Sequence, residues 1–159
     1  MSATNNPIMH ARDAVYGALA KCFITINGRR LNFMSLTDFE SKWDVNIVKV
    51  PILGKVGFGH KPAGGEGTWS GTAHYNQSHL RAIADEYQKT GIMPYFEIQV
   101  TSGDPASSAG TQTIVHHDCL CESFTLAKFQ SGDQLLDEEL SGTFESWDMP
   151  SRFNELDGV

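Results

Sequence analysis

Residues 67–76, Gly67-Thr68-Trp69-Ser70-Gly71-Thr72-Ala73-His74-Tyr75-Asn76, alternate between two kinds of side chain. In an extended chain, successive side chains point to opposite faces. One face then carries Trp69, Gly71, Ala73 and Tyr75, and the other carries Thr68, Ser70, Thr72 and His74. This period of two predicts a strand that meets a core on one side and water on the other.

One helix is expected directly after this strand, over residues 78–90. Ser78 is a suitable N-cap residue, and Gly91 can end the helix in a left-handed conformation. Between these two residues, one apolar stripe recurs at helical spacing, formed by Leu80, Ile83, Ala84 and Tyr87.

Further strands are expected on both sides of this centre. Residues 21–27 are followed by Asn27-Gly28, a strong signal for a hairpin turn. The other expected strands are 30–37 and 43–50 (one long bent strand broken near 37–41 is the alternative), 94–102, 111–118, 121–129 and 141–148. The pattern predicts a mainly β fold with one α-helix, an antiparallel β-barrel or sandwich with the helix packed on it.

A glycine-rich stretch at 53–66 interrupts the strands. It contains five glycines and a proline, and it reads as a loop. A loop of more than about 12 residues is uncommon in a compact domain unless it has a function. We therefore expect it to contact something outside the subunit.

The charge of the chain is unevenly distributed. The formal net charge is −7, and 8 of the 19 acids but only one of the 12 Lys and Arg residues lie in residues 131–159. Between Asp44 and Glu66 there is no acid, whereas Lys49, Lys55 and Lys61 fall there. The two regions either pair between copies of the chain or form two solvated surfaces.

The residues most suggestive of catalysis or metal binding do not form a convincing site. In a strand, His116 and His117 point to opposite faces and cannot share one zinc ion, while Cys119 and Cys121 supply only half a site. The glycine-rich stretch lacks the spacing of a phosphate-binding loop, and no serine stands in a nucleophile elbow. Glu138 and Glu139 lie in a solvated acidic run. The sequence therefore predicts no catalytic residue, no metal site and no cofactor.

Length, cysteine content and hydropathy suit a single domain made in a reducing cytoplasm. The chain has 159 residues, 40% of them hydrophobic, and three cysteines, an odd number that does not suggest a disulfide framework. We see no secretory signal and no apolar run long enough to span a membrane. A pI of about 5.2 argues against a nucleic-acid-binding surface.

The order of these features resembles a known family. A hairpin precedes Gly59-His60-Lys61-Pro62-Ala63-Gly64-Gly65-Glu66-Gly67-Thr68; a strand, a helix and Pro94-Tyr95-Phe96-Glu97-Ile98-Gln99-Val100 follow; and the chain closes with Gly142-Thr143-Phe144-Glu145-Ser146-Trp147-Asp148-Met149-Pro150. From about Gly17 to Phe153, this resembles the PBSX-like family of phage tail tube proteins. The resemblance departs at residues 1–12 and at His116-His117, where apolar or β-branched residues are expected.

The resemblance implies a structural role and a set of partners. It implies an N-terminal arm (1–16), a tail tube β-barrel domain (17–153) and a C-terminal tail (154–159). Copies would form hexameric rings that stack into a tube inside a sheath, in the tail of a virion or phage-like particle. The expected partners are other copies, the sheath, the baseplate and the tail terminator, with no membrane. DNA would pass through the lumen without specific binding, since an acidic wall does not hold phosphates.

Two sets of residues are the expected contacts. The inter-ring contact loop comprises Gly54, Lys55, Val56, Gly57, Phe58, Gly59, His60 and Lys61. The acidic contact or lumen residues comprise Asp133, Asp137, Glu138, Glu139 and Glu145. We also expect the loop at 53–66 to be disordered in an isolated subunit.

Two alternatives stay open at this point. One is the tube protein of a bacteriocin or secretion machine, which genome neighbours would distinguish. The other is a small-ligand-binding β-barrel, which would be monomeric with an apolar cavity.

Overall fold

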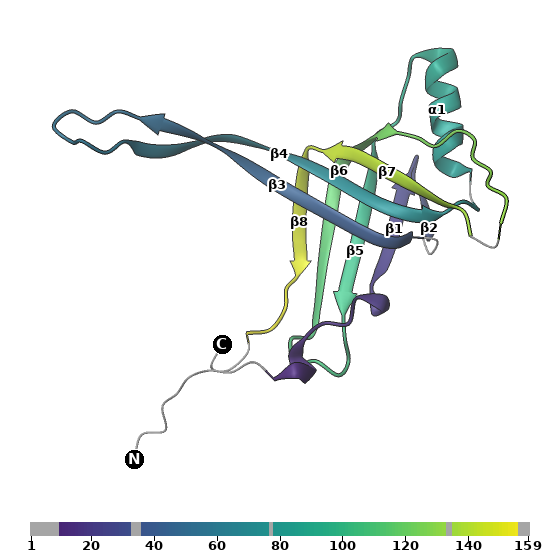
Figure 1. The fold of residues 1–159 in the computed structure, drawn as a ribbon, viewed down its shortest axis with the longest axis horizontal. Coiled ribbons are helices and arrows are strands. Elements are labelled where there is room, and N and C mark those ends of the chain that lie inside the picture. The colour runs from purple at the N-terminus through teal and green to yellow at the C-terminus, as the bar shows by residue number, and fades with distance from the viewer. Residues whose placement is uncertain (1–9, 33–35, 77, 133–134, 156–159) are drawn as a thin grey trace. The chain divides into compact units, whose positions relative to one another are not determined.

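Eight strands and one α-helix form the described part of the chain in a computed structural model (Figure 1). The structure describes residues 10–32, 36–76, 78–132 and 135–155. The elements in chain order are η1 (Ala11–Asp13), η2 (Gly17–Leu19), β1 (Lys21–Ile26), β2 (Arg29–Asn32), β3 (Leu36–Val50), β4 (Gly59–His74), α1 (His79–Thr90), β5 (Phe96–Gly103), β6 (Thr111–Ser123), β7 (Asp137–Phe144) and β8 (Ser146–Ser151). Within these ranges, no helix is long and apolar enough to cross a membrane.

The strands pair in the order β2-β1-β5-β6-β7-β4-β3, and β8 pairs with β6. The pairs β1–β2, β1–β5, β3–β4, β4–β7 and β6–β7 are all antiparallel. The expected mainly β, antiparallel fold is confirmed, and its sheet is open rather than closed into a barrel. The chain divides into two compact units, and β6 contributes to both of them.

The first unit contains residues up to 34, 96–117 and 147 onward. Its β1–β2 hairpin turns at Asn27 and Gly28, as the sequence predicts, and their φ angles of 51° and 76° match a type I′ turn. Ile24 on β1 lies opposite Ile98 on β5, and both are buried together with Phe96. These apolar positions form the core of the unit.

The loop between β5 and β6 binds segments from both ends of the chain. Ser108 donates to Oδ1 of Asp13 from its backbone nitrogen at 3.2 Å and from its hydroxyl at 2.5 Å. These bonds lower the pKa of Asp13 below its ordinary value. The backbone nitrogen of Asn154 donates to the carbonyl oxygen of Ala109 at 2.6 Å. Parts of the expected N-terminal arm and C-terminal tail are therefore both fixed to this loop.

The second unit contains residues 35–95 and 118–146. Trp69 and Ala73 on β4 are buried, as the alternating pattern predicts, and Leu140 and Phe144 of β7 are buried on the same face. Helix α1 buries Leu80 and Ile83. It ends at Gly91, whose φ of 74° is the left-handed conformation expected there.

The expected loop at 53–66 is wrong in its second half. Strand β4 begins at Gly59, so the connection from β3 covers only residues 51–58. Two glycines of β4 are covered by aromatic rings, as can occur in β-sheets. A Cβ at Gly65 would lie 2.9 Å from the indole of Trp43, and a Cβ at Gly67 would overlap the ring of Phe144.

Other expected strand boundaries are also wrong, among them the single strand at 141–148, which is divided between β7 and β8. Strand β3 runs without interruption from Leu36 to Val50, both through the interval between the expected strands 30–37 and 43–50 and through the break near 37–41 of the alternative. Strand β6 is continuous through residues 119 and 120 and ends at Ser123, so the strand expected at 121–129 does not extend to its second half. Pairing overrides the expected breaks in these segments, since β3 is held along β4 and β6 along β7.

Candidate assembly site

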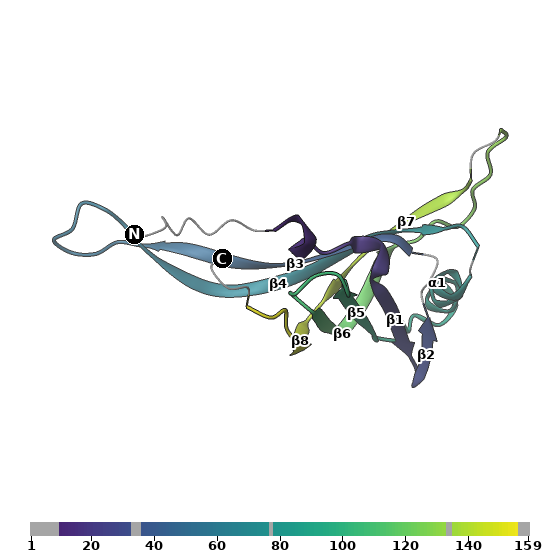
Figure 2. The ribbon, with the colours of Figure 1, turned by 90° about the horizontal axis from the view of Figure 1, so that it is seen from below.

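A two-stranded ribbon projects from the second unit. Strand β4 pairs with β7 only from Gly67 onward, whereas β3 and β4 continue to pair with each other as far as Val50 and Gly59. Figures 1 and 2 show this ribbon extending well beyond β7, with its tip pointing away from α1. We call residues 45–65 the hairpin arm.

The hairpin arm exposes many apolar side chains. Leu53 and Val56 at its tip are as exposed as in an extended chain, at 103%, and Phe58 is 60% exposed. The strands and turn add further exposed apolar residues, namely Val45, Ile47, Val48, Val50 and Ile52. Many exposed apolar side chains on one projecting hairpin are typical of a contact with another macromolecule.

The predicted contact-loop residues all lie in the hairpin arm. Those from 54 to 58 lie in the turn at its tip, where the backbone nitrogen of Lys55 donates to the carbonyl oxygen of Ile52 at 3.2 Å. Gly59, His60 and Lys61 lie in the first residues of β4. The tip therefore combines exposed apolar side chains with the cationic side chains of Lys49, Lys55 and Lys61.

A second surface is the polar face of β3, β4 and β7. The strand register places Glu40 opposite Ser70, and Asp44 opposite Glu66. On the other side of β4, Glu139 lies opposite Thr72, and Asp137 opposite His74. Residues opposite each other share a face of the sheet. We call this surface the acidic face: it carries Asp38, Glu40, Asp44, Glu66, Asp137 and Glu139, together with Lys42 and several Ser and Thr residues.

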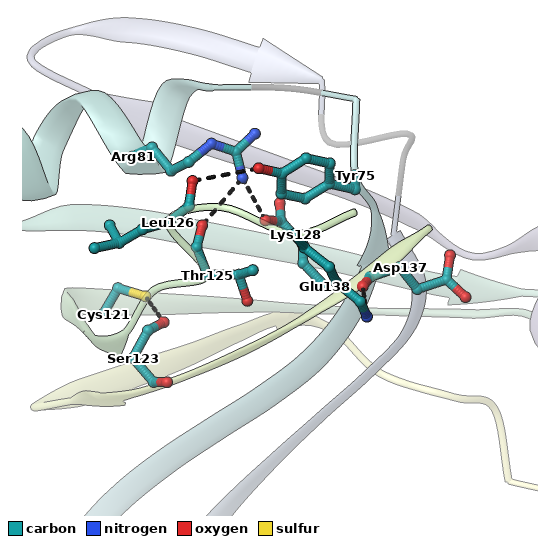
Figure 3. A network of polar contacts seen from close by, with 9 residues as sticks. All are labelled: Tyr75, Arg81, Cys121, Ser123, Thr125, Leu126, Lys128, Asp137 and Glu138. Carbon is teal, nitrogen blue, oxygen red and sulfur yellow. Dashed lines mark hydrogen bonds and ion pairs between the residues drawn. The ribbon is translucent and has the colours of Figure 1, made fainter. Parts of the chain in front are cut away.

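Glu138 points away from the acidic face and is buried against α1 (Figure 3). Its carboxylate accepts a hydrogen bond from Arg81 at 2.6 Å, and the same guanidinium donates to the carbonyl oxygen of Thr125 at 3.3 Å. The guanidinium also lies 4.4 Å from the ring centre of Tyr75, whose hydroxyl donates to the carbonyl oxygen of Leu126. Glu138 therefore joins β7 to α1 and, through Arg81, to the segment after β6, and its side chain is buried.

The remaining acidic candidates lie in different places. Oδ1 of Asp137 lies 2.9 Å from Nδ1 of His74, within hydrogen-bonding distance, and the Asp137 side chain is about half exposed. Glu139 on β7 and Glu145 after it are exposed, and Asp133 lies outside the described residues. Sequence reasoning missed the contributions of Asp38, Glu40, Asp44 and Glu66. Asp38, Glu40 and Asp44 occupy even-numbered positions of β3, which is a detectable signal in the sequence, but only the pairing with β4 places Glu66 on the same face.

His116 and His117 point to opposite faces of β6, as the sequence predicts. His116 is buried with its Nδ1 3.0 Å from the carbonyl oxygen of Ile98, and burial lowers its pKa. Cys119 and Cys121 are also buried, and burial raises the pKa of Cys121 to about 11. Among the described residues, no group of three or more His, Cys, Asp or Glu side chains is arranged to hold a metal ion.

An open antiparallel sheet with a projecting apolar hairpin and a separate acidic face has the features of a structural subunit that contacts other chains. A family model described as phage tail tube protein matches residues 8–151. The chain belongs to this phage tail tube family.

Two relatives from Bacillus subtilis (strain 168) support the assignment. The chain is 31% identical to the phage-like element PBSX protein XkdM over 74% of this chain and 80% of that one. It is 32% identical to the uncharacterized protein YqbM over 72% of this chain and 78% of that one. The expected membership of a PBSX-like tail tube family is confirmed.

Solved structures share the fold. A chain of the sheath-tube complex of an extracellular contractile injection system matches with a TM-score of 0.64 and 10% identity, covering 95% of this chain and 99% of that one. A chain of the tube-terminating cap of the anti-feeding prophage matches with a TM-score of 0.62 and 10% identity, covering 95% of this chain and 99% of that one.

Proposed function

We propose that this protein is the structural subunit of the inner tube of a contractile phage tail or phage-like particle, and that it has no catalytic role. Six copies form a ring, and rings stack into the tube. Membership of the tail tube family supports the structural role. The observation that carries the assembly is the hairpin arm: its two strands pair with each other and with no other strand of the described residues, and they expose apolar side chains along the arm.

The open sheet supports ring formation. In the described residues, β2 and β3 end the linear order of strands, and β8 pairs only with β6, so each of these three strands has one edge without a partner strand. Unpaired edges favour pairing with another chain, and a ring of copies removes them. We propose that neighbouring copies join through such edges.

The hairpin arm then reaches a copy in the adjacent ring. Its tip offers Leu53, Val56 and Phe58 for burial, and Lys55 and Lys61 for pairing with acids of that copy. The acidic face is the surface that we assign to the lumen. Its carboxylates repel DNA phosphates, so that DNA slides through without specific binding. Sheath, baseplate and tail terminator contact other surfaces of the tube.

Removing the hairpin arm tests this function. Val45 and Gly65 lie opposite each other, so residues 46–64 can be replaced by an Asn-Gly turn, the type of turn that joins β1 to β2. The pairing of β4 with β7 starts at Gly67 and is untouched. We expect a folded chain by circular dichroism and no tubes by electron microscopy.

The control is Gly17→Ala, outside the hairpin arm, where a Cβ would meet no atom within 4 Å. This variant should form tubes of normal diameter with sixfold rings. Normal tubes from the truncated chain, or only monomers from the natural chain in the presence of the other tail proteins, would contradict the proposal.

A further inference from the structure

His117 on β6 has a carboxylate at each of its two ring nitrogens. Its Nδ1 lies 3.1 Å from Oε1 of Glu97 on β5, and its Nε2 lies 2.8 Å from Oδ2 of Asp148 on β8. A neutral imidazole carries one N–H and can donate to only one of these oxygens, whereas the imidazolium donates to both. Both hydrogen bonds can therefore form at the same time only when the ring is protonated.

The three side chains connect three strands of the first compact unit. Strand β8 pairs with β6, and the structure gives it no second partner strand within the described residues. It also contains Pro150, a residue that sheets tolerate mainly in edge strands. The bond from His117 to Asp148 therefore adds a side-chain link to the backbone pairing that holds an edge strand.

We propose that His117 is a protonation-dependent clasp that holds the edge strand β8 on β6, and that pH thereby controls how readily copies join through this edge. The second half of this proposal rests on the proposed function, because it concerns the joining of copies. A strand fixed before association loses less conformational entropy on pairing, so the closed clasp favours assembly.

The electrostatic surroundings of His117 support the clasp. The hydrogen bond with Asp148 is the largest cause that raises the pKa of His117 above its ordinary value; partial burial opposes this, and Glu97 adds to it. These two carboxylates are the charged groups that face the ring, Glu97 from β5 and Asp148 from β8. On β6 itself, the neighbouring His116 lies on the opposite face with a lowered pKa, so it adds little positive charge near neutral pH.

The direction of the pH effect follows from this raised pKa. The stabilisation that protonated His117 gives to the folded state is fully present below the unfolded-state pKa of about 6.5. It is lost as pH rises through the higher folded-state pKa. Strand β8 should therefore be held most firmly in mildly acidic solution and should loosen toward alkaline pH.

An NMR titration of the His117 ring in the full chain tests the contacts. We expect its pKa to fall in Asp148→Asn and in Glu97→Gln, with the larger fall in Asp148→Asn. An unchanged pKa in both variants would overturn the proposal.

Hydrogen exchange of the β8 backbone amides tests the clasp itself, after correction for the intrinsic pH dependence of exchange. Between about pH 5.5 and pH 8.5, we expect protection to fall about tenfold for each unit by which the pKa of His117 is raised. His117→Gln should abolish this fall, and the control His60→Gln, at an exposed position of β4, should keep it. The same fall in the natural chain and in His117→Gln would overturn the proposal.

Tube growth, followed by light scattering and electron microscopy over the same pH range, tests the coupling between protonation of His117 and the joining of copies. Growth should slow toward high pH in the natural chain and lose this dependence in His117→Gln. If tubes form equally at every pH while β8 loosens, the coupling is wrong and the proposed function stands. If no tubes form at any pH, the proposed function and the coupling both fail, and the titration still decides the clasp.

Discussion

The guanidinium of Arg81 on α1 lies 2.6 Å from a carboxylate oxygen of Glu138 on β7, and the two side chains are only 18% and 7% exposed. The single helix of the second unit is thus joined to its sheet by a largely buried ion pair. The same guanidinium bonds the carbonyl oxygen of Thr125, so the segment after β6 depends on this pair as well. Its role is in folding, which separates Glu138 from the other acids of β7.

Breaking this pair should destabilise the subunit. Glu138→Ala leaves the Arg81 charge without its carboxylate in a buried site, and such losses cost about 3 kcal/mol or more. Glu139→Ala, one residue later on the exposed face, should change the free energy of unfolding by less than about 0.5 kcal/mol. Urea unfolding of both variants checks this, and equal midpoints would show that the pair is not important for stability.

The alternating segments were predictable from the sequence because local pattern and pairing agree there. Trp69 and Ala73 are buried as the period of two requires, and Gly91 ends the helix where it was expected. Gly64 and Gly65 were wrongly assigned to a loop, because the reason for a glycine in this part of β4 lies in contacts with residues distant in the sequence. Gly64, with a φ of 92°, lies at a register shift between β3 and β4, and Gly67 lies under the ring of Phe144, which is distant in sequence.

The candidate site was only partly predictable for the same reason. A loop was expected at 53–66, and its first part, with the exposed Leu53, Lys55 and Val56, does lie in the connection between β3 and β4. The burial of Glu138 and the exposure of Glu139 depend on which face of β7 meets the sheet core. That face is set by the pairing of β7 with β4, and an acidic run contains no alternation in residue type that reveals it.

Gly142 should tolerate no side chain. A Cβ there would overlap the carbonyl oxygen of Leu120 and would lie 2.7 Å from Nε1 of Trp69, which donates to that same oxygen at 3.2 Å. We expect Gly142→Ala to lower the free energy of unfolding by at least about 2 kcal/mol, because backbone must move to make room. Gly57→Ala, where the space is open, is the matched control in the same thermal unfolding experiment. Similar melting temperatures for both variants would contradict the expected close contact.

The apolar tip of the hairpin arm should matter for assembly and not for folding. Leu53→Ser with Val56→Ser changes side chains that are fully exposed in the subunit, so the free energy of unfolding should shift by less than about 0.5 kcal/mol. Tubes should be shorter or absent by electron microscopy, because the contact would lose two buried side chains, each worth roughly 1.5–3 kcal/mol. Tyr87→Ser with Ile92→Ser, two exposed apolar residues outside the arm, should leave tube length unchanged. The proposed contact would be wrong if both double variants behaved alike.

The lysines of the tip should make tube growth sensitive to salt. Lys55 and Lys61 lie in a region without acids, and exposed acids lie on the acidic face and at Glu145. One exposed ion pair contributes below about 1 kcal/mol, but the same contact recurs at every subunit of every ring. We therefore expect Lys55→Glu with Lys61→Glu to block tube growth without changing the melting temperature of the subunit. In the natural chain, growth should weaken as salt shortens the screening length below its physiological value of about 8 Å.

A compensating change identifies the acidic partner. Glu145→Lys is the suitable rescue, because Glu145 is exposed and lies outside the acidic face, whereas Glu138→Lys would disrupt the buried contact with Arg81 and unfold the subunit. Growth should return in part when Glu145→Lys is combined with the two lysine reversals, since opposite charges would again face each other across the contact. Lys21→Glu with Lys89→Glu makes the same change in net charge outside the hairpin arm and should leave tubes intact. If the lysine reversals leave tube length and salt sensitivity unchanged, the lysines and acids form two solvated surfaces that do not meet.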